Sequence, residues 1–287
     1  MTIVCTADQE YLPLLKILVK SIARNSPNVD LFIRLVNCEY LEAQEIEKIH
    51  PKITFLFDRV ALCSRRKKLQ RSGAPLQDEM FGVYDASANP ERFRGAKWLY
   101  SEKMAYCSNI KFNTINLLLN KGTESIMYMD ADAIVRGSLD ELEKISKKYD
   151  ISMLVETGDE SFMPDGGEID GKKLPRLDYY DRLTNGTKES NYTEWHAGLF
   201  TIKNNHRTRA FFKTMERKIS APAELYDWEA DQTLFNETYQ ETKDLSVYCL
   251  PKKFKDEEFS DNSFIWSGAG EHKFQAEKFI KEQQLYS

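Results

Sequence analysis

The chain has 287 residues, of which 41% are hydrophobic and 12% aromatic, so it can bury a sizeable core and is not a largely disordered chain. Its 40 basic and 45 acidic residues give a net charge of −5, which argues against a broad basic surface and hence against a nucleic-acid-binding protein. No apolar run reaches the roughly 18 residues of a membrane-spanning helix, and the first residues lack the basic and apolar regions of a signal peptide. We therefore expect a cytoplasmic protein, and the length fits a single α/β domain over residues 1–287.

The first third of the chain alternates strand and helix patterns. Apolar and β-branched runs predict strands at 2–7, 31–36 and 53–57. Apolar residues at helical spacing predict helices at 11–22 and 42–49. This βαβαβ order is typical of a mostly parallel sheet flanked by helices.

Two long polar segments, 64–95 and 156–194, interrupt the later elements, and loops of this length are usually functional. A helical region in two pieces is predicted at 98–119. Another helix opens at Ser138, which can form a capping box with Glu141. The remaining predictions are strands at 125–129, 151–155, 197–202 and 245–250, and helices at 209–219, 228–239 and from 271 onward.

Two carboxylates follow the apolar strand predicted at 125–129, in the order Asp130-Ala131-Asp132. Ligands of open α/β sheets gather at the carboxyl ends of the strands. Two carboxylates at such a turn can converge on Mg²⁺ or Mn²⁺, which also takes diphosphate oxygens. An acidic turn that ends a strand is the alternative.

The sequence MYMDADAIV at 127–135, followed by GSLDEL at 137–142, resembles the signature of the family 8 nucleotide-sugar glycosyltransferases of the GT-A fold, with their glycogenin-like relatives. The resemblance covers most of the chain and is weakest in the two long polar segments. It implies a Rossmann-like single domain, with a nucleotide-sugar-binding half at 1–137 and an acceptor-side half at 138–287. It also implies a Mn²⁺ or Mg²⁺ cofactor, a donor such as a UDP-hexose, and transfer with retention of configuration.

The sequence CTAD at 5–8, with Tyr11 after it, stands where the family holds the nucleotide base and ribose, so the resemblance implies binding roles for Thr6, Ala7, Asp8 and Tyr11. The Asp8 carboxylate can accept a bond from a uracil imide, and Tyr11 can stack on the base. The alternatives are a helix N-terminal acid for Asp8 and a core aromatic for Tyr11.

A basic residue that contacts the donor is implied near the start of the helical region at 98–119. Lys103 is the first candidate, because a lysine can offset the charge that builds on a leaving diphosphate. Lys97 and Arg94 are nearby rivals, and a surface lysine is the alternative for Lys103.

The sequence WHAGLF at 195–200 resembles the family's Asn-Ala-Gly-Val strand, with His196 in place of the asparagine. Gly198 allows a sugar to approach the backbone closely. His196 is either a ligand of sugar hydroxyls or a structural histidine.

The sequence EADQ at 229–232 resembles the family's Asp-Gln helix, whose two residues face the transferred sugar. The resemblance implies catalytic roles for both: Asp231 accepts bonds from sugar hydroxyls, and Gln232 turns its carbonyl toward the anomeric carbon. Ordinary polar residues at a helix start are the alternative.

The sequence WSGAGEHK at 266–273 resembles the late family segment, in which a histidine completes the metal shell. Here Ser267 fills the histidine position, and His272 is a tentative replacement as metal ligand. Gly268, Gly270 and Lys273 stand where the family grips the diphosphate.

The sequence therefore predicts a metal-dependent glycosyltransferase that moves a hexose from a nucleotide sugar. A catalytically inactive sugar- or nucleotide-binding protein on the same fold is the alternative. A sugar nucleotidyltransferase is disfavoured, because ADQE at 7–10 replaces the Gly-rich loop of that class. The sequence leaves the acceptor open among a glycan, a lipid and a protein, and it predicts no oligomeric state.

Overall fold

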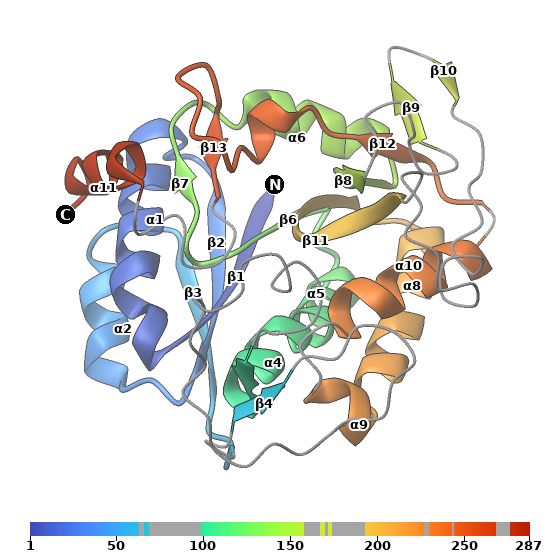
Figure 1. Cartoon of the computed structure of the whole chain (residues 1–287), viewed down its shortest axis with the longest axis horizontal. Helices are drawn as coiled ribbons and strands as arrows, with labels where there is room; N and C mark the ends of the chain where they lie inside the picture. The colour runs from blue at the N-terminus through green and yellow to red at the C-terminus, as the bar shows by residue number, and fades with distance from the viewer. Residues whose placement is uncertain are drawn as a thin grey trace, which may run out of the picture.

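Nine strands form one sheet in the described part of the chain, in the order β10-β9-β12-β8-β11-β6-β1-β2-β3 (Figure 1). The computed structural model describes residues 1–62, 66–68, 99–157, 167–169, 172–173, 193–226, 230–242, 244–267 and 276–287.

Four parallel strands form one side of this sheet, as the βαβαβ pattern predicts. Nearly every residue of β1, β2 and β6 is buried, because helices cover both faces. The strands are β1 (Thr2–Asp8), β2 (Asp30–Val36), β3 (Ile53–Asp58) and β6 (Ser125–Met129).

The other side of the sheet contains one long antiparallel strand. β11 (Thr193–Lys203) runs antiparallel to both β6 and β8 (Ile151–Thr157). Beyond β8 lie β12 (Val247–Cys249) and β9 (Gly167–Ile169), both parallel to it, and then antiparallel β10 (Lys172–Lys173). The sheet is mostly parallel, and the predicted α/β fold class is confirmed.

Helices cover both faces and bury two apolar cores. In β1, Ile3, Cys5 and Ala7 face one core, and Val4 faces the other. This alternation follows from the two-residue repeat of a strand. The first core packs α1 (Leu12–Asn25), α2 (Tyr40–Glu47) and α6 (Asp140–Lys148); the second packs α5 (Lys111–Asn120), α8 (His206–Ile219) and α10 (Ala230–Glu241).

Short elements complete the described fold. A two-stranded ribbon, β7 with β13, lies against the C-terminal helix through a small cluster that includes Trp266 and Phe279. The short elements are η1 (Gln9–Tyr11), β4 (Arg66–Lys68), β5 (Leu99–Ser101), α4 (Glu102–Asn109), β7 (Ile134–Val135), α9 (Pro222–Leu225), η4 (Lys252–Phe254), β13 (Ile265–Trp266) and α11 (Glu277–Gln284).

Three local predictions are wrong. Residues 99–101 form β5, which pairs with β4, instead of starting a helix. The polar segment at 156–194 contains β9, β10 and the first residues of β11. The predicted capping box of α6 is absent: Leu139 is the N-cap, and its N–H donates to Ser26 Oγ (3.0 Å), while Glu141 accepts from Lys253 Nζ (2.9 Å).

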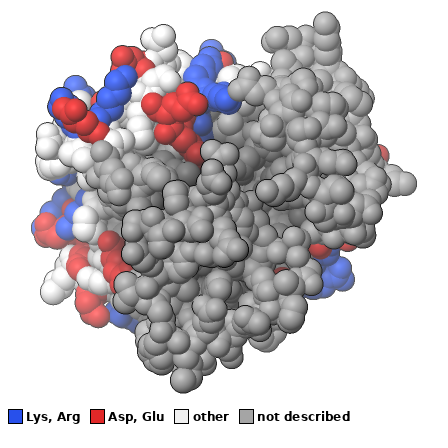
Figure 2. Space-filling model, in the orientation of Figure 1, with Lys and Arg blue, Asp and Glu red and all other residues white. Residues whose placement is uncertain are grey.

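No helix among the described residues is long and apolar enough to cross a bilayer. On the described part of the face seen in Figure 2, acidic and basic side chains lie side by side. This mixture matches the near balance of charges in the sequence.

His50 predicts a pH dependence of stability. Its side chain is buried, and its Nδ1 accepts from the N–H of Lys52 (3.2 Å). Burial, with the nearby Lys52 charge, lowers the pKa of His50 from its ordinary value. The unfolded chain therefore binds this proton more readily, so the contribution of His50 is intact above about pH 6.5 and is lost as the pH falls below it.

We expect the His50→Gln variant to show a flatter fall in the free energy of unfolding between pH 7 and 5 than the wild type does. Urea denaturation at several pH values measures this, and the limiting slope for one proton is about 1.4 kcal/mol per pH unit. Replacing the exposed His206 by glutamine is the matched control. Parallel pH profiles for wild type and His50→Gln would contradict the prediction.

Candidate active site

The predicted carboxylate pair lies at the carboxyl end of β6. Directly after the strand, the backbone N–H of Asp130 donates to the carbonyl of Gly198 (3.2 Å), and the carbonyl of Asp130 accepts from Ala133 (3.2 Å). This turn leaves Asp130 and Asp132 half-buried at the sheet edge. The position is the one at which open α/β sheets bind ligands.

The electrostatics of Asp130 and Asp132 make this pair a candidate cation site. Burial raises the pKa of Asp130 to about 6, the neighbouring Asp132 carboxylate adds to the rise, and Lys111 and Lys255 oppose it. Two adjacent carboxylates, one of which is costly to ionise, are stabilised by a hard divalent cation. The donor oxygens present therefore fit Mg²⁺ or Mn²⁺.

A bulge in β11 brings Gly198 against this pair. Trp195 of β11 pairs with Val155 of β8, and the next pair is Phe200 with Met153. Residues 196–199 of β11 therefore lie opposite a single residue of β8. A Cβ on Gly198 would lie 2.5 Å from Asp130 Oδ2 and 2.8 Å from Cε1 of His196. The close approach of carboxylate, ring and backbone therefore requires glycine.

His196 is part of the same bulge and is neutral near pH 7. Its Nδ1 accepts from the N–H of Gly198 (3.0 Å), and its Nε2 lies 3.1 Å from Nζ of Lys255. Burial, followed by the charges of Lys255 and Lys111, holds the pKa of His196 well below its usual range. The bond from Gly198 to Nδ1 is a structural contact of the kind that the sequence left open for this histidine.

Asp231 lies at the first turn of α10 and pairs with a buried lysine. Lys111 Nζ donates to Asp231 Oδ2 (2.6 Å) and to the carbonyl of Ala197 in the bulge (2.8 Å), and the Lys111 side chain is only 1% exposed. Ser108 Oγ also donates to Asp231 Oδ2 (2.8 Å). Gln232, half-buried, follows directly, and its N–H donates to Asp231 Oδ1 (2.7 Å).

Lys111 is a site residue that the sequence reasoning missed. It occupies the buried face of α5 together with Ile115, Leu118 and Leu119, at positions i, i+4, i+7 and i+8. A lysine on such an apolar face must be paired, because burying a lone ammonium is very costly. That pattern is the signal by which the sequence alone could have identified Lys111.

Lys103, the predicted basic residue, lies in another part of the site. Its Nζ contacts Asp8 Oδ2 (3.2 Å) and Glu10 Oε1 (2.7 Å). Burial lowers the pKa of Lys103, but the bond to Glu10 and the charge of Asp8 outweigh it and raise the pKa overall. Lys103 therefore neutralises the carboxylates that follow β1, whereas Lys111 serves the group around Asp130 and Asp231.

The residues predicted to bind the base surround the end of β1. Asp8 Oδ1 accepts from the N–H groups of Glu10 (2.9 Å) and Tyr11 (3.0 Å), so Asp8 caps the turn η1, as the alternative for this residue foresaw. Burial raises the pKa of the Tyr11 hydroxyl, and the charges of Asp132, Asp130 and Asp8 add to the rise.

The small residues predicted to line the donor site are buried. Ala7 and Ala131 are packed in the first apolar core. Thr6 is 7% exposed, and its hydroxyl has no hydrogen-bond partner among the described residues. The side chains of both alanines therefore contribute packing at this edge of the sheet.

Ser267 directly follows the ribbon of β7 and β13. In this ribbon Ile265 pairs with Val135 and Trp266 with Ile134, and β7 begins two residues after Asp132. Ser267 is buried. The predicted ligands Gly268, Gly270, His272 and Lys273 lie outside the described residues. Within the described residues, no group of three or more His, Cys, Asp or Glu side chains forms a metal shell.

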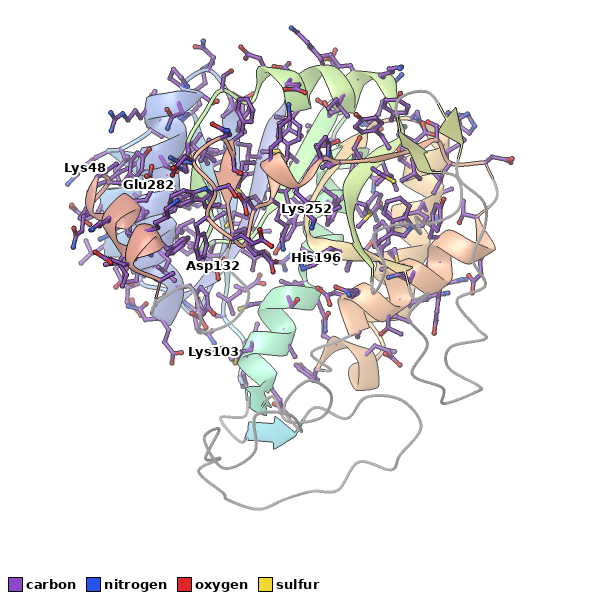
Figure 3. The ribbon with its side chains drawn as sticks, turned by 45° about the horizontal axis from the view of Figure 1, so that its top comes forward. Lys48, Lys103, Asp132, His196, Lys252 and Glu282 are labelled. Carbon is purple, nitrogen blue, oxygen red and sulfur yellow. The ribbon has the colours of Figure 1, made fainter. Side chains whose placement is uncertain are left out.

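Residues distant in the sequence thus meet at one end of the sheet. In Figure 3, Asp132 after β6 and His196 on β11 lie above helix α4, which carries Lys103. The geometry brings Asp130, His196 and Gly198 together with Asp231. Lys103 instead contacts Asp8 and Glu10 at the end of β1.

Comparison with known proteins identifies the family of this chain. The family model "Glycosyl transferase family 8" matches residues 2–257. Among solved structures, the bifunctional glycosyltransferase WbbM is similar with a TM-score of 0.55 and 14% identity, over 99% of this chain and 49% of that chain. The glycosyltransferase GlyE of Streptococcus pneumoniae TIGR4 has a TM-score of 0.52 and 10% identity, over 98% and 60%. The galactosyltransferase LgtC has a TM-score of 0.47 and 13% identity, over 99% and 96%.

The present chain spans about half the length of WbbM and less than two thirds of GlyE. At these identities, the likeness to solved structures shows the fold alone. No curated protein sequence matches the chain. The family model, in contrast, extends over nearly the whole sequence and includes the carboxylate pair and the Asp231 helix. The chain therefore belongs to glycosyltransferase family 8.

Proposed function

We propose that this protein transfers a hexose from a UDP-sugar to an acceptor, with retention of configuration, in a reaction that depends on Mn²⁺ or Mg²⁺. The observation that carries the proposal is the strained pair Asp130 and Asp132 at the end of β6, packed against Gly198. Family membership supports nucleotide-sugar glycosyl transfer.

Asp130 and Asp132 would hold the cation, and water, donor oxygens or His272 would complete its shell. When bound, a divalent cation supplies positive charge against the diphosphate and so makes it a better leaving group. The glycine-rich segment with Gly268, Gly270 and Lys273 is proposed to grip the same diphosphate.

On the sugar side, Asp231 would accept bonds from hydroxyls of the hexose, and Gln232 would present its carbonyl to the anomeric carbon. Lys111 has a supporting role: its ammonium bonds to Asp231 and fixes that carboxylate beside the β11 bulge. Because Lys111 also donates to Ala197, it couples the position of Asp231 to the backbone next to His196 and Gly198.

On the nucleotide side, Thr6, Ala7, Asp8, Tyr11 and Lys103 are proposed to surround the base and ribose. Asp8 uses Oδ1 for its cap, so a uracil imide would compete with Lys103 for Oδ2. We also propose that residues 1–137 mainly bind the donor, with Ala131 in the metal turn, and that 138–287 mainly face the acceptor.

The rival is a catalytically inactive binding protein. A panel of UDP-, GDP- and TDP-hexoses, incubated with the protein and Mn²⁺, separates the two by the release of nucleoside diphosphate. Release from one UDP-sugar, abolished by excess chelator, is the expected result. Tight UDP binding with no release from any donor would establish the inactive protein instead.

The serine at the histidine position predicts a weak intrinsic metal site. We expect Ser267→His to tighten Mn²⁺ binding in the absence of nucleotide by about tenfold or more, because an added imidazole ligand replaces water. Calorimetry with Mn²⁺ alone measures this, and Asn262→His, at an exposed position five residues earlier, is the control. Unchanged Mn²⁺ affinity would show that position 267 does not reach the cation.

A further inference from the structure

A second buried lysine, Lys255, points into the site from the segment after η4. Its side chain is 4% exposed, and its Nζ lies 3.1 Å from Nε2 of His196. Its charge also lowers the cost of ionising Asp130. None of the sequence motifs includes this residue.

The backbone holds Lys255 firmly beside the ribbon of β7 and β13. The next residue, Asp256, donates its N–H to the carbonyl of Ile265 (3.0 Å), and its carbonyl accepts from Ser267 (3.1 Å). The carboxylate of Asp256 accepts from the N–H groups of Glu258 and Ser260, both at 2.8 Å. Lys255 is therefore fixed next to Ser267, where the family pattern has a histidine.

The contact between Lys255 and His196 joins two donors. Because Gly198 donates its N–H to Nδ1, the neutral imidazole carries its proton on Nε2. The ammonium of Lys255 has three donors and no acceptor. Two proton-bearing nitrogens thus face one another across 3.1 Å, an arrangement that favours an acceptor entering beside them.

Lys255 has an ion-pair partner, Glu257, that a ligand anion can replace. Lys111 is held by Asp231 and the carbonyl of Ala197. Lys255 donates to Glu257, whose side chain is 39% exposed and can turn toward water. A ligand anion would meet a buried cation, where such bonds are strongest.

We propose that Lys255, together with Nε2–H of His196, binds an anionic oxygen of the nucleotide sugar. This inference rests on the proposed function and deepens it. Two groups of a nucleotide sugar can provide this anionic oxygen: the diphosphate, and a carboxylate on the hexose. The two sources are separable by the choice of ligand.

The test measures binding by calorimetry to the full chain, with uridine, UDP, UDP-glucose and UDP-glucuronic acid as probes. If the diphosphate is the source, Lys255→Met weakens UDP binding by about tenfold or more and leaves uridine binding unchanged. If a carboxylate is the source, Lys255→Met spares UDP and UDP-glucose, and UDP-glucuronic acid loses about tenfold or more. Affinities within twofold of wild type for all four probes overturn the proposal.

Lys252→Met removes the same charge from an exposed position on η4 and is the matched control, expected to change none of the four affinities. A Lys252→Met variant that loses as much affinity as Lys255→Met also overturns the proposal, since a long-range charge effect would then explain both. Melting temperatures show whether each variant is folded.

The Glu257→Gln variant provides an independent test if Lys255→Met does not fold. Freeing Lys255 from this carboxylate should tighten the same ligand by about two- to fivefold, a gain that loss of structure cannot imitate. Unchanged affinity in Glu257→Gln, with Lys255→Met unfolded, overturns the proposal. Wild-type protein that binds neither UDP nor any UDP-sugar would refute the proposed function itself, and this inference with it.

Discussion

Asp130→Asn is expected to lower kcat/KM by about 100-fold or more while the melting temperature of the metal-free protein stays the same or rises. Asparagine keeps the shape of the side chain but removes the charge that attracts a divalent cation. Losing one preorganised electrostatic group typically costs about 10²–10³ in rate. Because burial raises the pKa of Asp130 to about 6, the ionised carboxylate is unfavourable in the folded protein, and a neutral isostere removes that penalty.

Melting curves with and without Mn²⁺ test whether Asp130 helps to bind the cation. The wild type should be stabilised by Mn²⁺ and Asp130→Asn should not, since a ligand stabilises only the state that binds it. Asp132→Asn should behave in the same way. Asp140→Asn, an exposed acid at the start of α6, is the matched control and should keep both the shift and the turnover. Full wild-type turnover in excess chelator would remove the cation from the mechanism.

The elements that local sequence patterns define were predictable. β1, β2 and β3 alternate with α1 and α2 because each segment carries its own apolar repeat. The strand β5 was missed because its pairing partner β4 lies about thirty residues earlier, and a three-residue strand has no repeat of its own. The failed capping box of α6 has a similar cause: Glu141 bonds to Lys253, which lies 112 positions away, and Ser138 accepts from Asp140.

In the candidate site, too, the residues within one local pattern were predicted, and those whose partners are distant in the sequence were missed. Asp130 and Asp132 are adjacent and follow an apolar strand, so the sequence contains the whole pattern. Lys111 was missed because its partner, Asp231, lies 120 positions away. Lys255 and His196 are 59 positions apart, and only the β11 bulge brings them together.

The pair of Lys111 and Asp231 gives the second large expected effect. Both side chains are largely buried, at 1% and 12% exposure, and Nζ and Oδ2 are 2.6 Å apart. Lys111→Met fills the apolar volume of the lysine but leaves Asp231 as an uncompensated buried anion. Removing one partner of such a pair costs about 3–5 kcal/mol in the free energy of unfolding, and we expect a loss of this size in urea denaturation. Turnover should fall as well, because Asp231 loses the bond that positions it.

The double variant Lys111→Met/Asp231→Asn separates the two effects. With both charges removed, no buried ion is unpaired, so most of the lost stability should return, whereas turnover should not, since asparagine cannot replace the carboxylate toward sugar hydroxyls. Lys103→Met is the stability control: its ammonium is 26% exposed, and a pair of that kind is worth about 1 kcal/mol or less. A Lys111→Met variant as stable as Lys103→Met would mean that Asp231 finds another partner. A double variant that regains turnover would mean that Asp231 only supports the fold, and the sugar-binding role would then pass to Gln232 and the β11 bulge.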